Sequence, residues 1–334
     1  MGYLHGRNKK ERIDSVNVEM LENRRDHLAR CAEMDVPVAL LNRLESLGLG
    51  TKRRRHNVFS TVTNKAIINN IDMEDKITAT AAGGHGVMLT SAAAVSSEDW
   101  PLFAHLLPEV AFAGHSNSGK STLVNAMVGV PPRHGPASVS DRAGWTDQIC
   151  FYKLGKRPPK VTLADLPGYG FAVASPKDIK FWKIMTRSYL SGRLCLSFAC
   201  VLVDCTRGLC ASDTDLLRFL HSKKVAWHIV LTKADLLSAV ELAQSILVVQ
   251  EGLNKIFGAA PREGHAASYP NISPVSASTG AGIAGFWTML CSWTERDAVA
   301  SSSSSTAVKE HRNANAMRRA QARPPPVAAG RAAR

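Results

Sequence analysis

A glycine-rich segment at residues 114–121, GHSNSGKS, contains the residue types that bind phosphate groups. It matches the pattern G-x-x-x-x-G-K-[ST], and it lies directly after an apolar run and directly before a helical pattern. Gly114 and Gly119 permit a tight turn in which successive backbone N–H groups converge on an anion at the start of the helix. We expect Lys120 to reach the β- and γ-phosphates of a nucleotide, and the Ser121 hydroxyl to ligate Mg²⁺. The predicted nucleotide-binding residues of this loop are Gly114, Asn117, Ser118, Gly119, Lys120, Ser121 and Thr122.

A second motif, TKAD at residues 232–235, predicts which base is bound, and it follows the apolar run WHIVL. The Asp235 carboxylate can accept two hydrogen bonds from N1–H and the 2-amino group of guanine, whereas adenine offers no such pair of donors. We expect Lys233 to lie along the plane of the base. Asparagine usually opens this motif, and the hydroxyl of Thr232 in its place can still tie the loop. The predicted guanine-binding set is completed by Ser276 and Ala277, which follow another short apolar run.

The segment DLPGYG at residues 165–170 stands between these two motifs. We expect Asp165 to hold Mg²⁺ through water and the Gly168 amide to donate to the γ-phosphate. Tyr169 occupies the position at which many nucleotide hydrolases carry a glutamine that orients the attacking water. In the preceding loop, Thr146 is predicted to ligate Mg²⁺ only when a γ-phosphate is present, which would make that loop a switch. The alternatives for this role are Ser138 and Ser140.

Short apolar runs alternate with longer amphipathic runs from residue 110 onward. This alternation predicts an α/β fold of the P-loop type, with a mostly parallel central sheet covered by helices on both faces. The expected strands are 110–113, 161–163, 198–203, 227–231 and 273–275, and the expected helices are 121–128, 181–190, 215–220, 237–254 and 283–293.

The composition divides the chain into three segments. Residues 1–97 are predicted to form an extension with two short helices, a basic cluster and a small, polar linker at residues 78–98. Residues 98–296 hold the nucleotide-binding domain. Residues 297–334 are rich in Ser, Ala, Pro and Arg, and we predict disorder there because few large apolar residues are present to form a core. The basic cluster at residues 52–56 and the basic tail are each either solvated segments or contacts to RNA phosphates.

Charge suggests the class of partner. The chain has 41 Lys and Arg against 28 Asp and Glu, a net charge of +13, which favours binding to nucleic acid or to an anionic membrane surface. No apolar run approaches the roughly 20 residues that a membrane-spanning helix needs, so we expect no transmembrane segment. Four of the seven cysteines follow one another at five-residue intervals, which is not the spacing of zinc ligands, and we assign them to the core.

In chain order, GHSNSGKST, Thr146, DLPGYG, TKAD and VSAS resemble the motifs of translation-factor-type GTPases, and more narrowly the EngB (YihA) group of the TrmE-Era-EngA-YihA-septin-like superfamily. The resemblance covers roughly residues 98–296 and implies a G domain that binds GTP or GDP with Mg²⁺. It also implies assembly of the large ribosomal subunit. Related eukaryotic proteins serve organelle ribosomes, so we expect a mitochondrial location, with the cytoplasm as the alternative. The chain departs from the family pattern at His115, Ser118 and residues 143–146.

The wider superfamily implies a role for Asn117, since members with asparagine at this place can use it to ligate K⁺ between the phosphates. Such a cation would neutralise charge in the transition state, as an arginine finger does in other GTPases. The alternative is that Asn117 only shapes the loop. The predicted catalytic residues are Asn117, Lys120, Thr146 and Gly168, and the predicted metal ligands are Ser121, Thr146 and Asp165 for Mg²⁺ and Asn117 for K⁺.

Together these features predict a slow GTPase that binds rRNA-containing particles in its GTP state and leaves after hydrolysis. We expect stimulation by the partner or by K⁺, and a monomer off the ribosome. Two alternatives stay open. One is a GTP-dependent scaffold with negligible hydrolysis that recruits partners to rRNA, and the other is a GTPase held on an anionic membrane by its basic tail.

Overall fold

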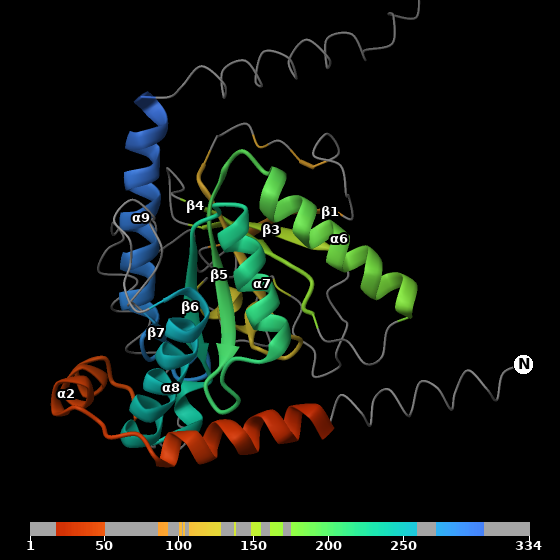
Figure 1. Cartoon of the computed structure of the whole chain (residues 1–334). Coiled ribbons are helices and arrows are strands. Elements are labelled where there is room, and N and C mark those ends of the chain that lie inside the picture. Colours follow the sequence, from red (N-terminus) through yellow and green to blue (C-terminus); the bar gives the residue numbers. More distant parts are fainter. Residues whose placement is uncertain are drawn as a thin grey trace, which may run out of the picture. The chain divides into compact units, whose positions relative to one another are not determined.

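The computed structural model of the protein describes residues 18–50, 86–92, 100–101, 103, 107–127, 137, 148–154, 161–169, 175–258 and 272–303. The chain divides into a first unit, Met1–Thr294, and a second unit, Glu295–Arg334. The strands among the described residues belong to the first unit, where helices lie against the sheet (Figure 1).

A seven-stranded sheet forms the centre of the first unit, with the strand order β1-β3-β4-β2-β5-β6-β7. The five strands from β4 to β7 in that order run parallel, whereas β1 and β3 add an antiparallel edge. This arrangement confirms the predicted α/β fold with a mostly parallel sheet. The strands are β1 (Gly86–Ala92), β2 (Glu109–Gly114), β3 (Ile149–Leu154), β4 (Val161–Asp165), β5 (Leu196–Asp204), β6 (Trp227–Thr232) and β7 (Ser273–Pro274).

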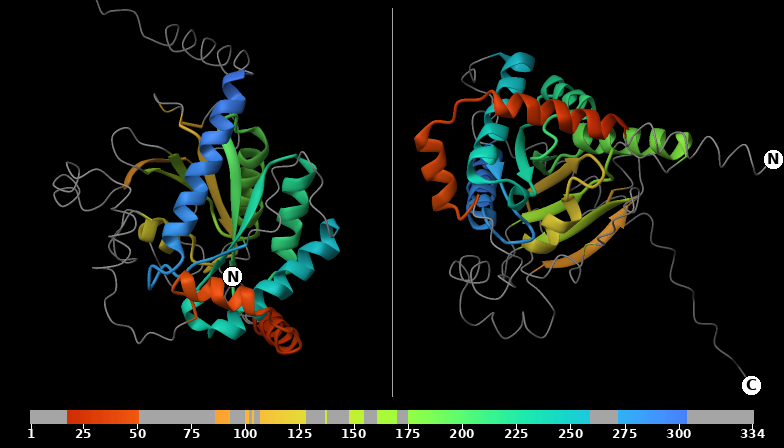
Figure 2. Two further views of the ribbon diagram at one scale, coloured as in Figure 1. Left: turned by 90° about the vertical axis from the view of Figure 1, so that its left-hand side faces the viewer. Right: turned by 90° about the horizontal axis from the view of Figure 1, so that it is seen from below.

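Helices cover both faces of this sheet (Figure 2). The buried side chains of α6, α7 and α8 pack on one face, and those of α5 and α9 pack on the other. The helices are one over residues 18–32, α2 (Val38–Ser46), α5 (Lys120–Met127), α6 (Pro176–Gly192), α7 (Ala211–Ser222), α8 (Ala239–Phe257) and α9 (Ile283–Ser303), with a short 3₁₀ turn at Ala234–Leu236.

Strand β5 shows why the central strands read as continuous apolar runs. Successive side chains of a strand point to opposite faces, and here both faces are buried. Cys200 and Leu202 join the cluster with α5 and α9, while Val201 and Val203 join the cluster with α6, α7 and α8. Each residue of the run therefore contributes to one of the two cores.

The predicted linker at 78–98 is wrong in its central part. Residues Gly86–Ala92 form β1, which pairs with β3 along its length, from Gly86 opposite Leu154 to Ala92 opposite Ile149. An edge strand is held by backbone hydrogen bonds, so small and polar side chains are compatible with it even though they give no apolar pattern. The sheet therefore begins before residue 98, the predicted start of the nucleotide-binding domain.

The predicted disorder from residue 297 is also wrong for its first residues, because α9 continues to Ser303. Extending an existing helix adds one hydrogen bond per residue fixed, and alanines such as Ala298 and Ala300 favour the helix. The rest of the tail, residues 304–334, lies outside the described residues, as does the basic cluster at 52–56.

The two short helices predicted near the N-terminus are confirmed at 18–32 and Val38–Ser46. They pack against the sheet domain, since Leu44 and Leu49 are buried in the same cluster as the inner residues of α8. Residues 18–50 thus share the core of the nucleotide-binding domain, contrary to the predicted boundary at 97. Among the described residues, no helix combines the length and the apolarity needed to cross a membrane.

Candidate functional site

The glycine-rich loop lies between the end of β2 at Gly114 and the start of α5 at Lys120, as predicted. Asn117 and Gly119 have left-handed backbones, with φ of 62° and 89°. A Cβ atom on Gly114 would lie 2.6 Å from the Leu202 carbonyl oxygen, so only glycine fits there. One detail differs from the prediction, because the Ser118 amide is engaged within the loop and donates to the His115 carbonyl at 3.1 Å.

Lys120 folds back over this loop and is buried. Its Nζ donates to the carbonyl oxygens of Gly114 and His115, both at 3.1 Å. Burial lowers the pKa of Lys120 to about 8, although the nearby Asp165 carboxylate opposes the shift. A desolvated ammonium group of this kind gains strongly from an anionic ligand, which fits the predicted role of Lys120 on phosphates.

Ser121 and Asp165 come together where α5 starts and β4 ends. The Ser121 hydroxyl donates to Asp165 Oδ2 at 2.7 Å. The other carboxylate oxygen, Oδ1, is buried and has no hydrogen-bond partner among the described residues. Burial raises the pKa of Asp165, while Lys120 and the Ser121 hydroxyl oppose that shift.

This oxygen pair fits Mg²⁺. The ion prefers hard oxygen ligands, and in nucleotide sites it is held by one or two protein groups together with phosphates and water. A carboxylate oxygen left unpaired in the core beside a serine hydroxyl supplies such a set. Thr146, the third predicted ligand, lies outside the described residues, as do Ser138 and Ser140.

The chain after β4 is joined to the glycine-rich loop. The Tyr169 carbonyl accepts from the Ser116 amide at 2.8 Å and from the Ser116 hydroxyl at 3.0 Å. A Cβ atom on Gly168 would lie 2.8 Å from Lys120 Nζ, so the backbone of Gly168 passes directly beside the ammonium group. Gly168 therefore lies where its amide can face a phosphate held by Lys120.

The Tyr169 side chain points toward helix α7. Its hydroxyl donates to Asp213 Oδ1 at 2.7 Å, and Asp213 is fully buried. The second oxygen of Asp213 accepts from the Cys210 amide at 3.0 Å, in the capping box that starts α7. Tyr169 thus connects the segment after β4 to α7, which is a structural role.

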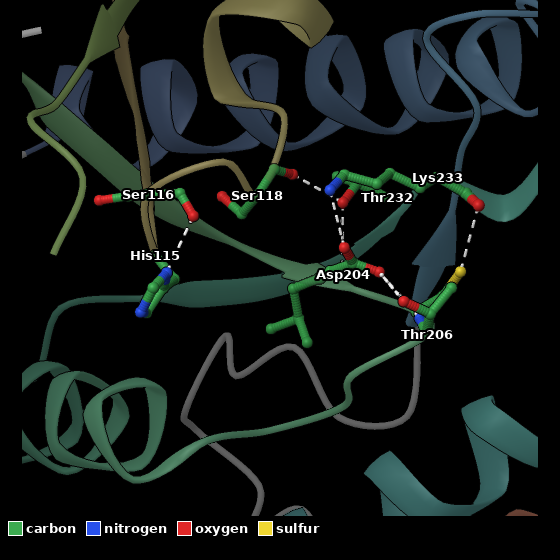
Figure 3. A network of polar contacts seen from close by, with 9 residues as sticks. His115, Ser116, Ser118, Asp204, Thr206, Thr232 and Lys233 are labelled. Carbon is green, nitrogen blue, oxygen red and sulfur yellow. Dashed lines mark hydrogen bonds and ion pairs between the residues drawn. The ribbon is translucent and has the colours of Figure 1, made fainter. Parts of the chain in front are cut away.

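The base motif is tied to the glycine-rich loop by its threonine (Figure 3). Thr232 Oγ1 donates to the Ser118 carbonyl at 2.7 Å and lies 3.2 Å from the Val203 carbonyl. The expectation that the threonine hydroxyl still ties the loop is therefore confirmed. The glycine-rich loop and the base motif are held together directly, although 114 positions separate the two residues.

Lys233 follows with a left-handed backbone, at φ of 59°. Its Nζ forms an ion pair with Asp204 Oδ2 at 2.7 Å, and Thr206 donates to the other Asp204 oxygen through its amide and its hydroxyl (Figure 3). Burial opposes ionisation of Asp204, but the Lys233 ammonium and the Thr206 hydrogen bonds outweigh it and lower the pKa. Lys233 is thereby fixed before any base is present.

Asp235 is oriented by the predicted Ser276. The buried Ser276 hydroxyl donates to Asp235 Oδ1 at 2.7 Å, and it also accepts from the Thr279 amide at 3.1 Å. The carboxylate is only partly buried, so it can still meet a ligand. Ala277 follows in the same turn after β7, as the prediction required.

Three residues of this region were missed from the sequence. Asp204 and Arg207 lie in and after the end of β5, and Asp213 lies at the start of α7. Arg207 is buried, and its Nε and Nη2 have no hydrogen-bond partner within the part of the chain that the structure describes. Burial of the His115 ring is the main cause that lowers the pKa of His115, and the positive charge of Arg207 is the second. The carboxyl end of a parallel strand is where α/β proteins place ligand-binding residues. The segment VLVDCTRG at residues 201–208, an apolar run that ends in polar residues, therefore held a usable signal.

Part of the chain is similar to known proteins. Residues 109–233 match the family described as 50S ribosome-binding GTPase. The "Probable GTP-binding protein EngB" of Rhodospirillum rubrum is 39% identical over 181 residues, which cover 54% of this chain and 73% of that protein. The protein of the same name from Rhodopseudomonas palustris strain BisB18 is 39% identical over 191 residues, covering 57% of this chain and 82% of that protein.

Solved structures are similar to about the same part of the chain. The crystal structure of a probable GTP-binding protein engB has a TM-score of 0.42 and 22% sequence identity, covering 56% of this chain and 99% of that chain. A single-residue variant of Aquifex aeolicus Era bound to GDP·AlF₄⁻ has a TM-score of 0.43 and 20% identity, covering 56% of each chain.

Proposed function

We propose that this protein acts as an assembly factor for the large ribosomal subunit. The proposal starts from its family, since the chain belongs to the EngB family of GTP-binding proteins and is a GTPase of that family. In this proposal the GTP form binds rRNA-containing particles, and hydrolysis to GDP and phosphate releases the protein. GTP and Mg²⁺ are held by the residues around Lys120, Asp165 and Asp235. The Mg²⁺ ion would neutralise charge on the phosphates, while Ser121 and Asp165 hold it.

The exposed side chains of helix α6 support the proposal of an RNA partner. It follows the segment that contains Gly168 and presents exposed lysines at three-residue intervals, Lys177, Lys180 and Lys183. Phe181 and Ile184 are 39% and 45% exposed. Residues three and four apart share a helix face, so the five side chains form one surface. We call it the α6 face.

The chemistry of the α6 face matches RNA. Lysine ammonium groups pair with phosphates and release counterions, and an exposed phenylalanine ring offers a surface on which an unpaired base stacks. The far end of α6 is fixed, because buried Arg193 pairs with Glu109 at the start of β2. Helix α6 begins eight residues after Gly168 in the chain, and the proposal is that its face responds to which nucleotide is bound.

The experiment is salt-graded co-sedimentation of the full chain with large-subunit precursors, in a GTP analogue or in GDP, followed by identification of the pelleted RNA. We expect rRNA to pellet with the GTP form. A Lys177→Glu/Lys180→Glu variant should make the slope of log affinity against log salt concentration shallower by the equivalent of about one to two phosphate contacts. Each contact contributes about 0.7–0.9 to that slope. The matched control is Lys223→Glu/Lys224→Glu, which changes two exposed lysines after α7 by the same charge. Failure of the GTP form to pellet with rRNA would overturn the proposal.

Hydrolysis is proposed to be slow without a partner and to use K⁺ at Asn117. Two observations support this: the Tyr169 hydroxyl is bound to Asp213, and Asn117 is exposed on the glycine-rich loop. Equal turnover in K⁺ and Na⁺, or an unchanged rate in Asn117→Asp, would exclude the ion. In that case Asn117 only shapes the loop through its left-handed backbone.

A GTP-dependent scaffold with negligible hydrolysis is the second candidate. Position 169 favours it, because a tyrosine stands there in place of a glutamine and its hydroxyl is bound to Asp213. Multiple-turnover phosphate release distinguishes the two candidates. Stimulation by large-subunit particles supports the GTPase factor, and no stimulation supports the scaffold.

We also propose a mitochondrial matrix location, with the cytoplasm as the alternative. The proposal rests on the resemblance to eukaryotic relatives that serve organelle ribosomes and on the basic tail after residue 296. Fractionation of cells that express the full chain with a C-terminal tag tests this, and recovery with cytoplasmic ribosomes would contradict it.

A further inference from the structure

The helix over residues 18–32 precedes the family match at 109–233, yet it buries a histidine next to the base motif. Figure 1 shows this helix in red beside α8, and Figure 2 shows it crossing α8 when the molecule is seen from below. His27 is 6% exposed, and its ring faces the loop that follows β5. His27 therefore joins this helix to the loop beside the base motif.

The His27 ring binds a backbone carbonyl jointly with α8. Its Nε2 lies 3.0 Å from Ser245 Oγ and 3.2 Å from the Cys205 carbonyl oxygen. Ser245 Oγ donates its only proton to the same carbonyl at 2.8 Å. A carbonyl oxygen can only accept, so the contact of Nε2 with Cys205 requires the proton on Nε2, and Cys31 Sγ lies 3.5 Å from the same nitrogen. Burial lowers the pKa of His27, which favours this neutral form.

The other side of the ring fills the space above Gly208. That glycine has a left-handed backbone at φ of 68°, and a Cβ atom on it would lie 2.2 Å from His27 Nδ1. The ring and the loop are therefore complementary in shape. No side chain could occupy position 208 while His27 stays in place.

The same loop holds the base motif from its other side. Cys205 donates through its amide to the Thr232 carbonyl at 3.1 Å and through Sγ to the Lys233 carbonyl at 3.3 Å. Asp204, one residue earlier, forms the ion pair with Lys233. A non-glycine residue in the left-handed region persists only when its surroundings hold it, and for Lys233 those surroundings include residues 204–205.

We propose that His27 is a positioning residue for guanine binding. It fixes the Cys205 carbonyl, and through Cys205 it fixes Lys233 and the turn that carries Asp235. The proposal rests on the proposed function, because it presumes that TKAD binds guanine. It predicts that the helix over residues 18–32 is part of the working nucleotide site, although it touches no nucleotide.

The test measures binding of a fluorescent GDP derivative to the full chain, with GDP and tripolyphosphate as competitors. In His27→Ala we expect GDP affinity to fall about five- to tenfold, the range expected for loss of one buried hydrogen bond. Tripolyphosphate affinity should stay within about twofold, because the glycine-rich loop keeps its contacts. His27→Gln should restore most of the GDP affinity, since its amide nitrogen can replace Nε2 as the donor.

The matched control is Arg30→Ala on the same helix. Arg30 pairs with Glu251 at 3.0 Å on the surface and does not contact the loop, so GDP affinity should stay within about twofold. Equal GDP affinity in His27→Ala and the unaltered protein would overturn the inference. Equal loss for GDP and tripolyphosphate would also overturn it, since that result indicates a general loss of structure. Failure of the unaltered protein to bind GDP would instead refute the proposed function.

A second measurement needs no substitution. If this helix supports nucleotide binding, then by reciprocity the nucleotide must stabilise the helix. We expect GDP to slow hydrogen exchange of backbone amides in residues 24–32 of the unaltered protein. Unchanged exchange there, with GDP bound, would overturn the inference even if the His27→Ala variant failed to fold.

Discussion

Replacing Tyr169 by phenylalanine tests whether its hydroxyl acts in the reaction or in the fold. The hydroxyl donates to Asp213 Oδ1 at 2.7 Å, so it points toward the start of α7. The phenylalanine ring keeps the packing, and the backbone bonds of residue 169 to Ser116 stay. The substitution therefore removes one hydrogen bond and little else.

The magnitude follows from the acceptor. A hydrogen bond to a buried carboxylate contributes about 1.5–3 kcal/mol, and we expect about 1–2 kcal/mol here because the tyrosine is only partly buried. The second Asp213 oxygen keeps its Cys210 partners, which limits the loss. At roughly 2–4 °C per kcal/mol for a domain of this size, the Tm should fall by about 2–8 °C.

The assay combines thermal unfolding with single-turnover GTP hydrolysis. We expect the hydrolysis rate to stay within about twofold. Tyr189→Phe is the control, since it removes a buried hydrogen bond to Glu109, at 2.8 Å, away from the nucleotide site. A double-mutant cycle with Asp213→Asn should give a coupling free energy of at least about 0.5 kcal/mol. A tenfold loss of hydrolysis with an unchanged Tm would refute a structural role, since that corresponds to about 1.4 kcal/mol of the barrier.

Three further predictions concern the nucleotide itself. Asp235→Asn should shift the preference from guanine to xanthine nucleotides by about 100-fold or more, and competition binding with GDP and xanthosine diphosphate measures it; retained guanine preference would contradict the role of Asp235. Ser121→Ala leaves Asp165 Oδ2 without its donor and should lower Mg²⁺-dependent hydrolysis by about 10–100-fold in a Mg²⁺ titration, while Mg²⁺-free GDP affinity changes little. The pKa of Lys120 is lowered from 10.5 to about 8 in the folded state, so between these pH values the unfolded chain binds more protons than the folded one. The contribution of Lys120 to the free energy of unfolding therefore rises as pH rises from 8 toward 10.5. GDP binding should take up close to one proton above pH 8, which calorimetry in buffers of different ionisation enthalpy detects; no uptake would contradict a lowered pKa.

Much of the site was predictable because its residues lie in short, contiguous motifs. The loop from Gly114 to Ser121 needs only a preceding strand and a following helix, and both patterns were visible in the sequence. Asp165 and Thr232 end strands of one parallel sheet, so their convergence at its carboxyl edge followed from the alternation of elements. The elements missed are β1, β3 and the extension of α9. Strand β1 and the extension lack a strong apolar period, whereas β3, Ile149–Leu154, is largely apolar and held a signal that was not used.

The sequence by itself determined the α/β fold and the residue types that the proposed function assigns to phosphate, magnesium and guanine, because those depend on local pattern and on strand ends. Only the tertiary structure decided how the pieces are held. The Tyr169–Asp213 bond and the His27–Cys205 contact join segments that are 44 and 178 positions apart. No local propensity encodes such pairs, since they arise only when the sheet brings its loops together and each buried polar group must find a partner. Tyr169 and His27 could therefore be assigned roles only from their contacts in the folded chain.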